Sequence, residues 1–288
     1  MNLVGAIGCY LASQVFAVVD GAMAHHLGPR GLSVGQIAFA NALGLLVLVV
    51  ILSGRNTPKV FRTLHPWKQV ARALLSCGAM WLMIYALTHL PFADASAINR
   101  TRPLWMILLG AMLLSEAVTA QRWLATVVGI VGAIVTLGPA FNQWNPAYVA
   151  AVAGVLFSSG TMIANSYLGR FDSTVTTLAY SSAVILVLSS PAALDVFPWA
   201  LWPEIVVLAS ANALSLWLTQ VAVRKADVSL LAPYDNVRLP IAILIGILAF
   251  AEIPSWSTLV GSALIISAGT LLFVRERRAR TSLGSERA

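Results

Sequence analysis

The sequence has few charged residues. Only 10% of its 288 residues are Asp, Glu, Lys or Arg, whereas 59% are hydrophobic and the mean hydropathy is +0.83. A water-soluble domain carries roughly 25% charged residues. A chain of this composition cannot cover its surface with polar groups in water, which excludes a soluble globular fold and makes the lipid bilayer the expected solvent.

Cysteine is nearly absent as well. The chain contains Cys9 and Cys77 and no other cysteine, and both fall inside long apolar runs. Cysteines in such runs pack as small hydrophobic side chains, so we expect no disulfide framework. A zinc-protease His-Glu-x-x-His motif and repeated acidic clusters are missing too. We therefore expect no enzyme activity, no cofactor and no metal.

The chain consists mostly of long apolar runs. A spanning helix needs about 20 mostly apolar residues, and helices are expected because unpaired backbone polar groups are costly in hydrocarbon. The ten predicted spans are 3–22, 34–53, 70–90, 95–114, 121–138, 147–168, 174–194, 204–223, 228–250 and 255–274.

The basic residues are divided unevenly between the predicted loops. If the N-terminus is cytoplasmic, the outer loops hold only Arg30. The inner loops and tail then hold Arg55, Lys59, Arg62, Lys68, Arg72, Arg122, Arg170, Arg224, Lys225, Arg275, Arg277, Arg278, Arg280 and Arg287. Because positively charged loops stay in the cytoplasm, both termini are predicted to be cytoplasmic. The net charge of +7 then reflects orientation and contact of the tail with lipid headgroups, not nucleic-acid binding.

One order of residues occurs twice along the chain. In the first half it is Ala-Asp-Ala-Ser at 93–96, Arg102-Pro103 and Glu116; in the second it is Ala-Asp-Val-Ser at 226–229, Arg238-Leu239-Pro240 and Glu252. A repeat of five spans must enter the membrane upside down the second time, an arrangement typical of transporters. We predict an all-α polytopic membrane protein of two inverted five-helix repeats, residues 1–140 and 141–288.

These segments resemble the EamA-type repeats of the drug/metabolite transporter superfamily. The likeness rests on Ala86-Leu87, Pro103 and Glu116, on the run from Val228 to Asp235, and on Leu239-Pro240, Glu252, Trp123-Leu124, Gly129, Gly132, Gly261 and Gly269. The resemblance implies ten helices, cytoplasmic termini, and a central cavity lined mainly by the third, fourth, eighth and ninth helices. This chain departs from the usual pattern at Asn99-Arg100-Thr101-Arg102, where members commonly carry apolar or small polar residues.

Arg100 and Arg102 lie early in the fourth predicted span, and Arg238 lies in the ninth. A charge in a spanning helix costs at least ~2.5–3.5 kcal/mol, so each arginine should face a cavity or a partner. Residues three apart share a helix face, whereas residues two apart do not, so Asn99 and Arg102 should face one way and Arg100 another. The arginine fork suits carboxylate or phosphate, which predicts an anionic or zwitterionic substrate.

Ion pairing inside the protein is the alternative to substrate contact. Asp235 lies three residues before Arg238 and can form an intrahelical pair with it, and Asn236 lies between them. Arg100 or Arg102 can likewise pair with Asp94 or Glu116, and both glutamates that end the repeats, at 116 and 252, are expected to anchor helix ends.

Further candidates come from polar and aromatic stripes. Cys77, Trp81, Tyr85 and His89 recur every four residues, and Asn212, Ser215 and Thr219 share one face of the eighth span. They are either cavity walls or ordinary helix-packing groups. As substrate-binding candidates we take Trp81, Tyr85, Asn212 and Gln14, together with Asn99, Arg100, Arg102, Asp235, Asn236 and Arg238.

Two other groups have simpler interpretations. Asp20, His25 and His26 cluster at the outer end of the first span, where a solvated loop is favoured over a metal site. Ala125, Gly129 and Ala133 form a small-residue row that suits close helix packing, within the chain or against a second copy.

The sequence as a whole predicts a secondary transporter in a bacterial cytoplasmic (inner) membrane. Its expected substrate is an amino acid, an amino-acid derivative or a similar small anionic or zwitterionic metabolite, moved by alternating access, with export slightly favoured. The alternatives are uptake or exchange of a larger ring-bearing metabolite, nucleoside- or vitamin-like, and, less favoured, an intramembrane enzyme.

Overall fold

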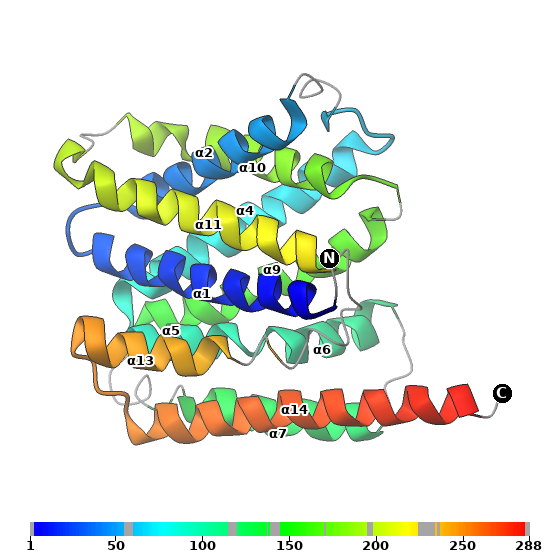
Figure 1. The fold of residues 1–288 in the computed structure, drawn as a ribbon. Helices are drawn as coiled ribbons and strands as arrows, with labels where there is room; N and C mark the ends of the chain where they lie inside the picture. The colour runs from blue at the N-terminus through cyan, green and yellow to red at the C-terminus, as the bar shows by residue number, and fades with distance from the viewer. Residues whose placement is uncertain are drawn as a thin grey trace.

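The computed structural model is a layered bundle of helices. It describes residues 3–54, 60–114, 120–136, 138, 145–169, 171–194, 198–223, 234 and 237–285, and these ranges contain no strand. The helices are α1 (Leu3–Leu27), α2 (Val34–Ser53), α4 (Pro66–His89), α5 (Phe92–Asn99), α6 (Arg102–Leu114), α7 (Ala120–Thr136), α9 (Pro146–Leu168), α10 (Thr174–Ala193), α11 (Trp202–Val223), α13 (Arg238–Phe250) and α14 (Trp256–Ser285), with a 3₁₀ turn, η2, at Trp199–Leu201. Figure 1 shows α2 and α10 at one edge of the bundle and α7 and α14 at the other.

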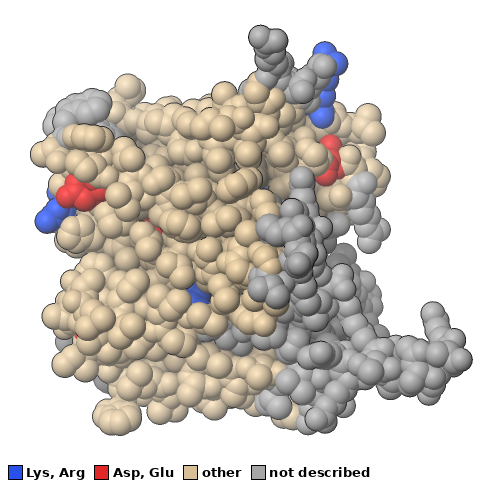
Figure 2. Space-filling model, viewed as in Figure 1, with Lys and Arg blue, Asp and Glu red and all other residues tan. Residues whose placement is uncertain are grey.

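Lengths and surface both fit a membrane. In the described part of the chain, five stretches are long and apolar enough to cross it: Gly5–Leu27, Val34–Ser53, Pro66–His89, Pro146–Asn165 and Thr174–Ala193. On the face drawn in Figure 2, charged side chains gather near the edges, and the band between them is almost entirely uncharged. The chain is an all-helical polytopic membrane protein.

Most helix boundaries agree with the predicted spans. α2 has the predicted bounds, and α9, α10 and α11 begin within two residues of theirs. The last helix differs, because α14 continues through the basic tail to Ser285 although we expected the tail to end it. The beginning of the ninth predicted span, residues 228–233, lies outside the described residues.

The fourth predicted span, 95–114, is broken into two helices. α5 ends at Asn99 and α6 begins at Arg102, with tight backbone bonds from Arg100 N to Ala97 O (3.0 Å) and from Thr101 N to Ile98 O (3.0 Å) between them. Pro103 explains the break, since it lacks an N–H and its ring clashes with the carbonyl four residues earlier, that of Asn99. The span is therefore discontinuous at the arginine-bearing segment.

Arg72 is a correction to the loop assignment. We placed it in an inner loop, but it lies in α4 with 3% of its surface exposed. Its guanidinium donates to Gln69 Oε1 (3.2 Å), Asn165 Oδ1 (3.2 Å), Thr177 O (2.8 Å) and Ser181 Oγ (2.6 Å). These acceptors satisfy a charge that hydrocarbon would not tolerate, and they bind α4 to α9 and α10 at one end of the bundle.

Ser33 shows how a motif can mislead. Residues 31–35 read Gly-Leu-Ser-Val-Gly, which fits the Gly-x-Ser-x-Gly pattern of hydrolase nucleophiles. In the structure Ser33 is the N-cap of α2, and it forms a capping box with Gln36. The nucleophile motif requires a strand before the serine, whereas a loop and then α1 precede this one. The serine begins a helix.

The pair α7 and α14 packs through glycine. A Cβ added at Gly261 would lie 2.6 Å from Gly132 O and 2.8 Å from Thr136 N, and would overlap the Thr136 hydroxyl. On the neighbouring face, a Cβ at Gly129 would lie 2.8 Å from Leu104 Cδ2 of α6. Part of the small-residue row thus serves packing within the chain, where backbones approach closely.

We expect Gly261→Ala to separate α7 from α14 and to reduce the free energy of unfolding by about 1–3 kcal/mol, the usual cost of overpacking. The measurement is the midpoint of thermal unfolding in detergent. Gly8→Ala is the matched control, because a Cβ there meets no atom within 4 Å. Equal midpoints for the two variants would contradict the close packing.

Candidate functional site

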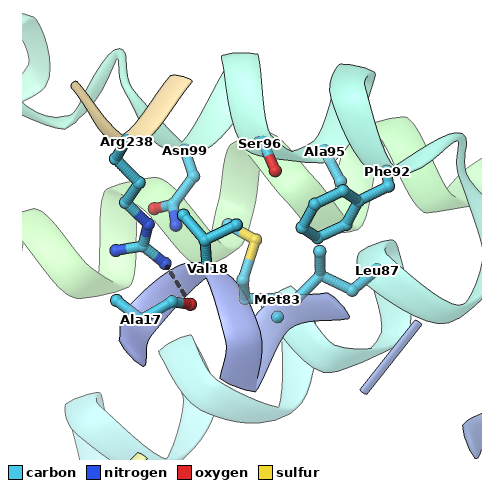
Figure 3. Close-up of a pocket in the computed structure, with 10 residues that line it drawn as sticks. Ala17, Val18, Met83, Leu87, Phe92, Ala95, Ser96, Asn99 and Arg238 are labelled. Atoms are coloured by element: carbon cyan, nitrogen blue, oxygen red, sulfur yellow. Dashed lines mark hydrogen bonds between the residues drawn. The ribbon is translucent and has the colours of Figure 1, made fainter. Parts of the chain in front are cut away.

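A cavity opens between α1, α4, α5 and the beginning of α13. Its volume is about 20 Å³, which is room for about one or two water molecules, so the structure has this cavity nearly closed. It is lined by Ala17, Val18 and Gly21 of α1, Met83 and Leu87 of α4, Phe92, Ala95, Ser96 and Asn99 of α5, and Arg238 of α13. Figure 3 shows Arg238 and Asn99 at one end and Phe92 and Leu87 at the other. The cavity has a polar end and an apolar end.

Arg238 gives the polar end its charge. One guanidinium nitrogen donates to Ala17 O at 3.3 Å, drawn as the dashed line in Figure 3, and the Asp20 carboxylate attracts the same group. Arg238 is also the first residue of α13, whose 13 residues rise only about 20 Å. Since the hydrocarbon core is ~30 Å thick, the positive amino end of this half-helix lies within the membrane. Together these features suit an anionic group.

Asn99 and Arg102 lie on the adjoining helix break. Arg102 donates to Asn99 Oδ1 at 3.0 Å, so the two side chains meet as expected, although across this break. Ser159 of α9 donates to the Arg102 carbonyl at 3.3 Å. Arg100 is half-buried at the end of α5, and its N–H is bonded within the last turn. Of the three arginines, Arg238 lines this cavity, and Arg102 reaches it through Asn99.

Asp20 is a half-buried acid whose role the sequence interpretation missed. We expected it in a solvated loop with His25 and His26, but all three lie in α1. Its two oxygens accept from Asn41 of α2 and Asn212 of α11, each at 3.0 Å. The rule applied to the arginines would have found it, because Asp20 falls inside the first predicted span. Asn212, which we took as a cavity residue, holds this carboxylate and joins α11 to α1.

Asp94 serves as a second internal anchor. It is 3% exposed and accepts from the hydroxyls of Tyr148 (2.8 Å, α9) and Thr258 (α14). The sequence left a pair with Arg100 or Arg102 open; the observed partners instead join α5 to two distant helices.

Trp81, Tyr85 and Gln14 are not among the residues that line this cavity. Trp81 donates to Ser189 of α10 at 3.1 Å, and Tyr85 stacks on His89 with ring centroids 4.2 Å apart. Gln14 is buried in α1. A role for these three in binding stays a prediction. Asp235, Asn236 and Glu116 fall outside the described residues.

We expect Asp20→Leu to reduce the free energy of unfolding by about 1–3 kcal/mol, because it leaves buried amide donors of Asn41 and Asn212 without their acceptor. Thermal unfolding of Asp20→Leu, Asn212→Leu and the double variant measures this. The double variant should cost less than the sum of the single ones; simple additivity would show that the contact does not join α1 to α11.

Comparison with known protein families identifies the family of this chain. Residues 2–138 match the profile of the EamA-like transporter family. A crystal structure aligns with 96% of this chain and 99% of its own at a TM-score of 0.67 and 19% identity, which supports the fold alone.

Characterised relatives cover most of the chain. A riboflavin transporter of Brucella anthropi is 30% identical over 82% of this chain and 86% of its own length. An S-adenosylmethionine uptake transporter of Rickettsia bellii is 31% identical over 95% and 94%. The pseudopaline exporter CntI of Pseudomonas aeruginosa is 26% identical over 92% and 94%.

Proposed function

The chain belongs to the EamA-like transporter family and carries a small metabolite across a membrane, and we propose that it takes up a metabolite with a flat ring and an anionic or zwitterionic group. It is a transporter and not an enzyme. The observation that carries the substrate proposal is the two-ended cavity of Figure 3, with Arg238 at one end and Phe92 and Leu87 at the other.

The relatives favour the ring-bearing alternative over the amino-acid export that we expected first. Riboflavin and S-adenosylmethionine, named for two of them, both combine a nitrogen heterocycle with a polar chain. Such a molecule would place its ring against the apolar end and its polar group near Arg238, whose fork suits carboxylate or phosphate. Export of an amino-acid-like metabolite remains the second candidate, supported by the exporter from Pseudomonas aeruginosa.

Alternating access between two inverted five-helix units, residues 1–140 and 141–288, is the proposed mechanism. Its support is that α6 begins with Arg102-Pro103 and α13 with Arg238-Leu239-Pro240, at short helices of the kind that inverted-repeat transporters place within the membrane. The beginning of α1 and the end of α14 also lie at the same end of the bundle (Figure 1). With the basic loops inside, that end would be cytoplasmic.

The bacterial inner membrane is the proposed location, since the relatives named above are bacterial. A second copy of the chain remains a candidate partner. The exposed apolar side chains of α7, among them Leu124, Val127 and Ile134, would suit either lipid or such a copy.

The test of function is uptake of labelled riboflavin and S-adenosylmethionine by proteoliposomes that contain the purified protein. We expect one of them to enter unchanged in composition. Outward movement alone, from preloaded vesicles, would favour the export candidate, and conversion without flux would contradict transport altogether.

Arg238→Ala should slow the transported probe by about tenfold or more, because a hydrogen bond to a charged group is worth about 1.5–3 kcal/mol. Arg102→Ala should slow it less, since Arg102 acts through Asn99. Arg30→Ala is the matched control: Arg30 is 48% exposed and pairs with Glu204 at the surface, where ion pairs contribute little. Wild-type rates for Arg238→Ala would overturn the anion site.

A further inference from the structure

Glu252 joins three helices of the first half of the chain to the segment between α13 and α14. Its Oε1 lies 3.0 Å from Nε2 of His25 in α1, and its Oε2 accepts from the N–H of Phe92, the first residue of α5, at 2.7 Å. The other ring nitrogen of His25, Nδ1, is bonded to the Leu87 carbonyl of α4. We call His25, Glu252 and these two backbone groups the latch.

The contacts of the latch set the number of hydrogens that the His25 ring and the Glu252 carboxyl must share. A backbone carbonyl only accepts, so Nδ1 of His25 must carry a hydrogen. An ionised carboxylate also only accepts, so the contact between Nε2 and Oε1 needs a second hydrogen, on the ring or on the carboxyl. A neutral imidazole facing an ionised Glu252 lacks that hydrogen. The bonds therefore require either an imidazolium with a carboxylate or a neutral ring with a carboxylic acid.

This proton lies directly beside the cavity. Phe92 and Leu87, which the latch binds through their backbones, line the apolar end. The rings of His25, Phe92 and Phe250 pack together, with centroids 4.7 Å apart for His25 and Phe250 and 5.9 Å for Phe92 and Phe250. A Cβ at Gly21 would meet the Phe92 ring at 3.3 Å, so the wall is tight. With the termini inside, this wall faces outward, and releasing the latch frees Phe92 and α5.

Other titratable groups face the latch from the elements packed around it. Asp94 of α5 interacts electrostatically with Glu252 while bonded to Tyr148 of α9 and Thr258 of α14. On α1, the His26 ring lies 6.4 Å from Phe250, and the Asp20 carboxylate is bonded to Asn41 and Asn212. The ring of Phe250 in α13 and the carbonyl of Leu87 in α4 are the groups of these two helices that contact His25.

We propose that the latch is a proton-binding outer gate: closing the cavity toward the outside takes up one proton on the His25–Glu252 pair, and opening returns it to the outer medium. The proposal rests on the proposed function only in treating this cavity as the transport site. Because the closed state binds the extra proton, acid stabilises it, and the open population grows as pH rises through the range in which imidazoles titrate. Substrate entry is thereby tied to proton release.

The experiment measures access to the cavity without any substrate. Ser96→Cys places a thiol in the lining, and a membrane-impermeant maleimide is added to the outside of sealed vesicles. Arg30→Cys, on the surface, corrects for the pH dependence of thiol reactivity, and the parent chain, labelled in parallel, corrects for Cys9 and Cys77. We expect the corrected labelling rate of Ser96→Cys to rise several-fold from pH 5 to pH 8, by no more than about tenfold per pH unit for one linked proton.

Two variants distinguish the effect of the bound proton on cavity access from the effect of the side-chain packing. Glu252→Gln can accept from Phe92 N–H with its oxygen and donate to a neutral His25 ring with its amide, so the closed contact no longer needs the extra proton and the labelling rate should not rise from pH 5 to pH 8. His25→Gln removes the titrating ring and should make the labelling rate flat as well. His26→Gln, the matched control, should retain the wild-type pH dependence.

A flat rate in the otherwise wild-type chain would overturn the gate, as would an unchanged pH dependence in Glu252→Gln or His25→Gln. Loss of pH dependence in these two variants with its retention in His26→Gln supports it. None of these outcomes depends on riboflavin or S-adenosylmethionine being transported, so failure of the proposed substrates is distinguishable from failure of the gate.

Discussion

The structure depends on one constraint: inside hydrocarbon, every backbone and charged group must find its partner within the protein. The break between α5 and α6 meets this constraint locally. Thr101 is 1% exposed, its hydroxyl donates to Ile98 O, and it accepts from the Trp105 indole. Ser159 covers the Arg102 carbonyl from α9. A proline that would disrupt an isolated helix is therefore tolerated, and the two short helices it creates carry arginine into the bilayer.

Acidic side chains meet the same constraint over long distances. Asp20, Asp94 and Glu252 each bond to two different elements, and the partners lie up to 227 residues apart in the chain. Each carboxylate therefore fixes the relative position of helices that could otherwise slide past one another in lipid. Arg72 does the same with opposite charge at the other end of the bundle. Because such groups are stable only when their partners are in place, their rearrangement can separate two states sharply.

The positions of most helices could be predicted from the sequence, because the length and apolarity of a span are local properties. α2 matches its prediction at both ends. Asn99 and Arg102 do meet, but they do so across the break between α5 and α6 and not on one continuous helix. Local patterns failed where a residue had two roles. Asp20 and Arg72 were assigned to loops because charged residues usually lie there, and the Gly-x-Ser-x-Gly match at residues 31–35 was overlooked, without consequence because Ser33 caps a helix. Trp81 and Tyr85 share a stripe on α4, yet they contact different neighbours.

Sequence alone determined that this protein is a helical membrane protein, because composition and run length are properties of the chain itself, and its motifs resembled the EamA family to which it belongs. The sequence also has an arginine one or two residues before a proline in two spans. Tertiary structure decided which groups meet. Arg238, and not Arg100, lines the cavity. Asn212 donates to Asp20, and His25 contacts Glu252, which lies 227 residues away in the sequence. Contacts of that range depend on how helices pack, and apolar helices of similar length carry little information on their neighbours until small residues and buried polar groups are matched in space.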